Sequence, residues 1–134
     1  MMNFYKFHTG VLDNQNYAPL IDRLRNGIYT KDMSIIEHII KKEPIYVVRY
    51  AFMALGGRWK EAEHIIMKDP VCAYQYAMYV VQGRWRDVEP IMLTYAFTAL
   101  CYAKDIMKSR WPEAEDIIKT DPGYWVMYCQ AFGL

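Results

Sequence analysis

The pattern of hydrophobic and polar residues repeats every 26 positions between about residues 31 and 134. The tripeptide Gly57-Arg58-Trp59 returns as Gly83-Arg84-Trp85 and as Ser109-Arg110-Trp111. In the second period, Trp59, Ala62, Ile65 and Ile66 follow the spacing of one helical face, and polar residues fill the other face. The periods 31–56, 57–82, 83–108 and 109–134 therefore each predict a pair of short amphipathic helices.

Proline and glycine residues mark the expected ends of these helices. Asp69-Pro70 places a good N-cap before a proline at the first helical position, which predicts a second helix over about 70–82, ended by Gly83. In the third period Tyr95-Ala96 replaces the Asp-Pro step, which weakens the expected break between its helices. Pro90 lies within the first helix of that period, so we expect this helix to start late, with Asp87 as its cap, or to be kinked.

Helix pairs of this size bury their apolar faces only by stacking on neighbouring pairs. The sequence therefore predicts an all-α fold, an α-solenoid of four 26-residue helix-turn-helix repeats with an N-terminal half-repeat. The half-repeat falls in residues 1–30 and acts as a cap. A length of 134 residues fits a single domain over residues 1–134.

Composition and charge exclude several classes of protein. Hydrophobic residues make up 54% of the chain and charged residues 23%, which predicts a packed core and excludes disorder. A formal net charge of +1 argues against nucleic acid as a partner. The longest uncharged apolar run, Pro90 to Ala103, has 14 residues, fewer than the roughly 18 that a membrane span needs. With no secretory signal pattern and three cysteines in apolar stretches, we expect reduced thiols and a cytoplasmic protein that binds no membrane.

The residues that carry chemistry do not converge on a catalytic or metal site. His38 and His64 lie one period apart, but two imidazoles fall short of the ligand set that zinc needs. Glu113 and Glu115 stand two residues apart, so they face different sides of a helix. The sequence holds no nucleophile motif, phosphate-binding glycine loop or paired-cysteine motif. We therefore expect no enzyme activity, no cofactor and no metal.

Three recurring positions indicate a structural role instead: an arginine, the tryptophan after it, and a glutamate five residues after the arginine. We expect an Arg–Glu contact that fixes each turn, beside a partly buried tryptophan that holds the stack. The residues are Arg58, Trp59 and Glu63; Arg84, Trp85 and Glu89; and Arg110, Trp111 and Glu115.

The pattern Gly-Arg-Trp-Xaa-Glu-Ala-Glu-Xaa-Ile-Ile-Met-Lys-Asp-Pro at residues 57–70, followed by Ala-Tyr-Xaa-Tyr-Ala at 73–77, resembles a short helical repeat of tailed bacteriophages. In those proteins the repeat occurs in tandem arrays. The resemblance covers about residues 31–134 and is sharpest in the second and fourth repeats. It implies a viral source, a location in the host cytoplasm and a repeat scaffold, and it implies no catalytic motif.

Two sets of apolar residues are candidates for binding. On the outward side of the second helices we expect Phe52, Met53, Met78 and Tyr79 to form an exposed patch, or else to be covered by residues 1–30. The last helix carries Trp125, Met127 and Phe132 and a single polar side chain, whereas terminal repeats normally need a polar outer face. That helix therefore predicts a homo-oligomer, most simply a two-fold dimer.

These features predict a non-enzymatic protein-binding module. With the viral resemblance, we expect a phage protein that binds and inhibits, or redirects, a host protein such as a defence component. One alternative is a protein that sequesters a nucleotide or signalling molecule in a tyrosine-lined pocket, with Arg49 and Arg84 as cationic groups. The other is a component of virion assembly.

Overall fold

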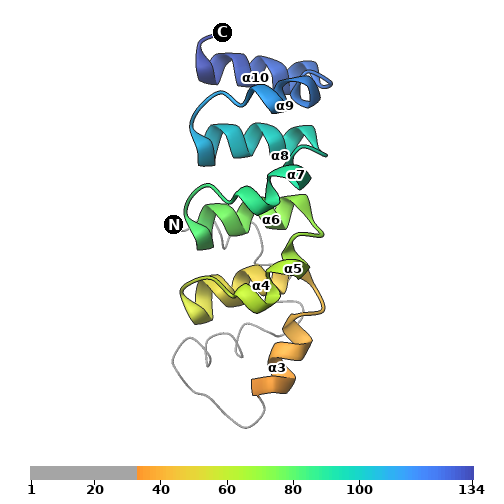
Figure 1. The fold of residues 1–134 in the computed structure, drawn as a ribbon, viewed down its shortest axis with the longest axis vertical. Coiled ribbons are helices and arrows are strands. Elements are labelled where there is room, and N and C mark those ends of the chain that lie inside the picture. Colours follow the sequence, from red (N-terminus) through yellow and green to blue (C-terminus); the bar gives the residue numbers. More distant parts are fainter. Residues whose placement is uncertain (1–32) are drawn as a thin grey trace. The chain divides into compact units, whose positions relative to one another are not determined.

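The computed structural model describes residues 33–134, with side chains from Glu37 onward. Within that range every regular element is helical and the helices pack against one another, so the chain has an all-α repeat fold (Figure 1). The predicted N-terminal half-repeat lies outside the described residues. The chain divides into two compact units between Ile66 and Met67, and each is described on its own. The single domain over residues 1–134 stays a prediction.

The first compact unit contains three helical stretches in its described part. They are α3 (Met33–Ile40), then α4 (Pro44–Tyr50) continued by the π-helical turn η1 (Ala51–Leu55), then the 3-10 turn η2 (Lys60–Ala62) leading into α5 (Glu63–Ile66). Val47, Val48, Tyr50 and Ile66 are buried, so the apolar faces predicted from the sequence do form a core.

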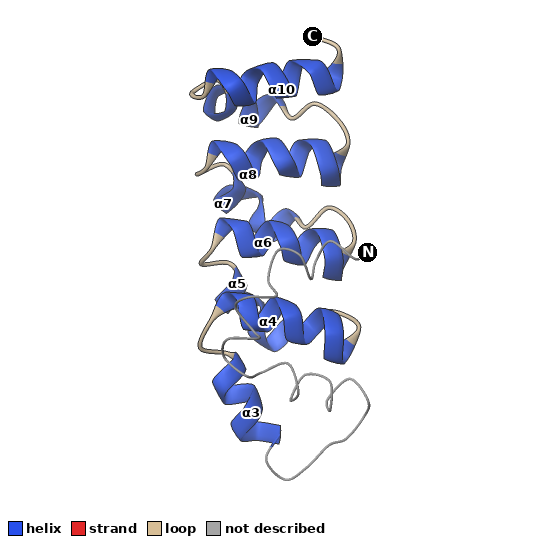
Figure 2. Ribbon diagram, turned by 180° about the vertical axis from the view of Figure 1, so that it is seen from behind, coloured by secondary structure: helices blue, strands red, loops and turns tan. Residues whose placement is uncertain are grey.

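The second compact unit stacks helix pairs in chain order (Figure 2). Its elements are α6 (Pro70–Tyr76) with η3 (Ala77–Val81), η4 (Arg86–Val88) with α7 (Glu89–Met92), α8 (Ala96–Cys101) with η5 (Tyr102–Met107), α9 (Pro112–Ile118), and α10 (Pro122–Phe132). The small residues Ala73, Ala99 and Ala114 are fully buried, which lets neighbouring helices approach closely.

The Asp-Pro steps begin helices as the sequence predicts. The Asp69 carboxylate accepts hydrogen bonds from the backbone N–H groups of Val71 and Cys72 at 2.9 and 3.1 Å. Asp121 accepts one from the N–H of Tyr124 at 3.1 Å. Each aspartate therefore satisfies N–H groups that the first helical turn leaves without partners.

The third repeat keeps the same helix boundaries although it lacks an Asp-Pro step. Tyr95 is extended, and α8 begins at Ala96, one period after Pro70. The Tyr95 side chain makes no capping hydrogen bond, and the Thr98 hydroxyl donates to the carbonyl oxygen of Tyr95 at 2.9 Å. The late start expected for the first helix is not seen: η4 and α7 begin at Arg86 and Glu89, one period after η2 and α5, and the N-cap of α7 is Val88 rather than Asp87. Pro90 fits because it lies in the first turn, where no intrahelical N–H is needed.

The second helices of the first three repeats end in a π-helical turn, which the sequence analysis did not foresee. The residue that takes the left-handed conformation is Gly56, Gln82 or Lys108 in turn. The second helix of the second repeat therefore ends at Gln82 and not at Gly83 as predicted. α10 has no π-helical turn and reaches its left-handed residue, Gly133, one position earlier in the period. The π turn therefore adds one residue to each of the earlier helices.

Candidate functional site

The predicted Arg–Glu contacts are confirmed in all three repeats. Arg84 holds Glu89 through two hydrogen bonds of 2.7 and 3.0 Å. The equivalent contacts are Arg58 with Glu63 at 2.7 and 2.9 Å, and Arg110 with Glu115 at 3.0 and 2.8 Å. The arginine hydrogen bond holds the pKa of Glu89 below its ordinary value, and Arg110 does the same for Glu115. These contacts fix the loop before each first helix.

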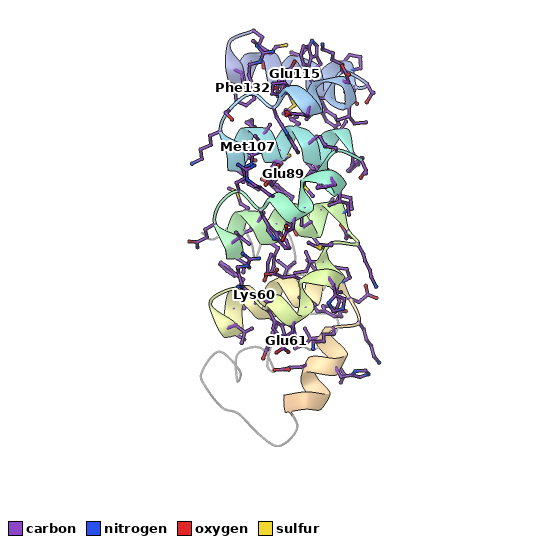
Figure 3. The ribbon with its side chains drawn as sticks, in the orientation of Figure 1. Lys60, Glu61, Glu89, Met107, Glu115 and Phe132 are labelled. Atoms are coloured by element: carbon purple, nitrogen blue, oxygen red, sulfur yellow. The ribbon has the colours of Figure 1, made fainter. Side chains whose placement is uncertain are left out.

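A tyrosine from the second helix of the repeat completes this contact. The Tyr102 hydroxyl accepts a hydrogen bond from the backbone N–H of Trp85 at 2.8 Å and donates one to Glu89 at 2.9 Å. Tyr128 makes the same pair of bonds with Trp111 and Glu115. Figure 3 shows Glu89 and Glu115 between the paired helices of their repeats. The glutamate thus joins the loop, the first helix and the second helix.

The tryptophans connect successive repeats within each compact unit. The ring centroid of Trp59 lies 4.6 Å from that of Tyr50, and Trp111 lies 5.3 Å from Tyr102. Trp85 packs on Tyr76 in the same way at 5.1 Å. All three tryptophans are buried, more deeply than the partly buried rings expected. The repeated motif therefore serves packing, which is the structural role predicted for it.

In the fourth repeat, α10 covers its own tyrosine. Trp125 stacks on Tyr128 at 5.3 Å and Phe132 meets the same ring edge-on at 4.8 Å. Trp125 stands where Ala73 and Ala99 stand in the two preceding repeats. Trp125 and Phe132 therefore pack on Tyr128, whereas Tyr102 is packed by Trp111 from the following repeat.

The outer face of α10 nevertheless stays apolar and open. Val126 is 53% exposed, whereas Leu100, one period earlier, is 1% exposed. Met127 and Leu134 are also exposed, and no residue from Pro122 to Leu134 carries a formal charge. Of the residues predicted for this surface, Met127 lies on it, while Trp125 and Phe132 are half-buried against Tyr128. Lys119 places its ammonium group 4.7 Å from the Trp125 ring centroid.

The patch predicted on the second helices is only partly exposed. Met53 is 7% exposed, so it does not contribute to an exposed patch. Phe52 is half-buried in the first compact unit, and Met78 and Tyr79 are half-buried in the second. Whether residues 1–30 cover these side chains lies outside the described residues.

An exposed aromatic cluster in the second compact unit was missed by the sequence analysis. Tyr95 and Phe97 are 49% and 38% exposed, and their ring centroids lie 6.3 Å apart. Phe97 also packs 5.8 Å from half-buried Tyr124 at the start of α10. The signal was available, because Tyr95 and Phe97 stand where the second repeat has Asp69 and Val71.

A partly buried polar contact links the second helices of the second and third repeats. The Tyr74 hydroxyl donates to Asp105 at 2.7 Å. Burial raises the pKa of Tyr74, and the hydrogen bond to Asp105 raises it further. Burial, with Asp105 nearby, also raises the pKa of Cys101 to about 11, which keeps that thiol protonated at neutral pH.

The remaining candidate groups are placed on the surface or in structural contacts. His38 and His64 are exposed, and across residues 33–134 no three His, Cys, Asp or Glu side chains gather as a metal site requires. Arg49 is buried and Arg84 is ion-paired with Glu89. In the described part of the chain, no helix is long and apolar enough to span a bilayer.

Comparisons of the chain with protein-family models, with curated proteins and with solved structures find no match.

Proposed function

We propose that this chain is a non-enzymatic protein-binding repeat module that docks partners on the outer face of α10. The observation that carries the proposal is the exposure of Val126 and Met127 on α10 and of Leu134 just after it, in a segment without a charged side chain. Open apolar faces of this kind are typical of contact surfaces. The repeats supply a rigid support for it, because Glu89 and Glu115 are each held by an arginine and a tyrosine.

The simplest occupant of the α10 face is a second copy of the chain in a two-fold dimer. Because α10 has no formal charge, pairing it with itself brings no like charges together. The resemblance to phage repeats supports a host protein, such as a defence component that is inhibited or redirected, as the functional target. That target would place the protein in the host cytoplasm.

Replacing Val126 and Met127 with glutamate tests the proposal. In the two-fold dimer this double variant brings carboxylates into the pair, so we expect a dimer in the wild type and a monomer in the variant by sedimentation velocity. The double variant Gln82→Glu/Ser109→Glu adds the same charge at exposed loop positions and should stay dimeric.

The host target is tested by affinity capture from a bacterial lysate with the same three proteins. One host protein retained by the wild type and by the Gln82/Ser109 control, and lost by the Val126/Met127 variant, supports the proposal. A monomeric wild type that retains no host protein at this face would refute it.

A further inference from the structure

Trp125 is a large residue at a position where the other repeats carry small or branched ones. It lies three positions before Tyr128, and residues three apart share one face of a helix. The equivalent positions hold Val47, Ala73 and Ala99, which are all fully buried. A short side chain beside the tyrosine leaves room for the tryptophan of the following repeat, and an indole at the same position takes that room.

In the first compact unit, the tryptophan of the following repeat makes two contacts with the repeat before it. The ring centroid of Trp59 lies 4.6 Å from that of Tyr50. The ammonium group of Lys41 lies 5.1 Å from the centroid of the same Trp59 ring. The tyrosine and the lysine together therefore mark the place where an incoming tryptophan packs.

The fourth repeat has the same tyrosine and lysine, but a tryptophan of its own contacts both. Tyr128 and Lys119 stand three periods after Tyr50 and Lys41. The Trp125 ring stacks on Tyr128 at 5.3 Å, and the Lys119 ammonium group lies 4.7 Å from its centroid. Trp125 thus makes, from within its own repeat, both contacts of an incoming tryptophan.

A second tryptophan has no room at this site. Tyr128 is already fully buried beneath Trp125 and Phe132. One period earlier, Ala99 is fully buried in α8, and α8 packs on α9 of the following repeat. Forcing extra atoms into a filled site of this kind costs about 1–3 kcal/mol. An indole at the position of Ala99 therefore opposes the close approach of a following helix.

From these contacts we infer that Trp125 closes the α10 face to a further unit of this repeat, whether that unit follows in the same chain or comes from another molecule. The face then accepts a partner that brings no tryptophan to Tyr128. The α10 helix of a second copy meets that condition, because each copy keeps its own Trp125 on its own Tyr128; this occupant rests on the proposed function. Trp125 is the residue that selects a closed pair over an open stack of repeats.

The test adds a second copy of residues 109–134 directly after Leu134, which continues the 26-residue period without a gap. Hydrogen exchange followed by mass spectrometry then measures whether the added repeat packs on α10. With Trp125 in place, we expect the amides of the added repeat to exchange rapidly. Trp125→Ala gives this position the alanine of the second and third repeats, and it should slow that exchange at least about tenfold.

Two further variants of the extended chain separate closure of the face from a loss of stability. Trp125→Val gives the position the residue of the first repeat and keeps a branched apolar side chain in α10, so it should slow the exchange as alanine does. Tyr124→Ala removes the neighbouring ring, which packs on Phe97 and not on Tyr128, and should leave the added repeat in rapid exchange.

Slow exchange of the added repeat with Trp125 in place would overturn the inference, and so would rapid exchange in both Trp125→Ala and Trp125→Val. The dimer of the chain without the added repeat is measured separately, through Val126 and Met127. If the exchange result fails while that dimer forms, this inference falls and the proposed function stands. If the exchange result holds while the wild type binds neither itself nor a host protein, Trp125 still closes the face and the proposed function falls.

Discussion

Removing one hydroxyl group, by Tyr102→Phe, tests whether the buried tyrosine holds each repeat together. The ring stays in place against Trp111, so the packing area is unchanged. What is lost is the acceptor for the buried N–H of Trp85 at 2.8 Å and the donor to Glu89 at 2.9 Å. Glu89 keeps its two hydrogen bonds from Arg84.

The magnitude follows from what each group loses. A buried N–H without an acceptor costs about 1–3 kcal/mol. Because Glu89 is still paired with Arg84, the loss on its side is smaller. We expect Tyr102→Phe to lower the free energy of unfolding by about 2–3 kcal/mol, and the melting temperature by about 8–12 °C for a chain of this length.

Urea unfolding followed by far-ultraviolet circular dichroism and by tryptophan fluorescence gives the free energy, and agreement of the two probes checks for a single transition. Tyr124→Phe is the control, because it removes a hydroxyl that makes no hydrogen bond within the described residues and should change stability by less than about 0.5 kcal/mol. If Tyr102→Phe is as stable as this control, the hydroxyl does not satisfy the Trp85 N–H and the reasoning is wrong.

Three further predictions concern pH, reactivity and backbone strain. The pKa of Glu89 is lowered in the folded state, so the stability that its carboxylate contributes is complete above the ordinary carboxyl pKa of about 4.3. That stability is lost as the pH falls through the lowered value. Urea unfolding between pH 3 and pH 7 should therefore show that the free energy of unfolding falls less steeply with acid in Glu89→Gln than in the wild type. Alkylation followed by mass spectrometry should find Cys101 about 100-fold slower than an ordinary thiol at pH 8, and faster in Asp105→Asn, because burial first and Asp105 second raise its pKa to about 11. Lys108 has a φ of 55°, a conformation that glycine adopts without strain. Lys108→Gly should therefore raise the free energy of unfolding, measured in urea, by about 0.5–1 kcal/mol, and a destabilised variant would contradict the strain argument.

The period and the helix breaks were readable from the sequence because they depend on local chemistry. Asp69 caps the helix at which it was predicted, Asp121 caps the equivalent helix of the fourth repeat, and the arginine and glutamate five residues apart meet as expected. These contacts join residues close together in the chain, so spacing alone defines them. At Tyr95 the break was expected to be weaker, yet α8 begins one period after Pro70 without a capping carboxylate.

The tertiary structure decided which side chains face solvent and which meet across repeats. Met53 is buried, whereas Tyr79, one period later in the same kind of π-helical turn, is half-buried, so repeat position alone does not set exposure. The 26-residue repeat determined the helices and the motif that ties them together. Burial depends on neighbours in space, so three features could be seen only in the packed structure. They are the hydrogen bonds of the Tyr102 hydroxyl, the packing of Trp125 on Tyr128, and the exposure of the Tyr95 and Phe97 rings.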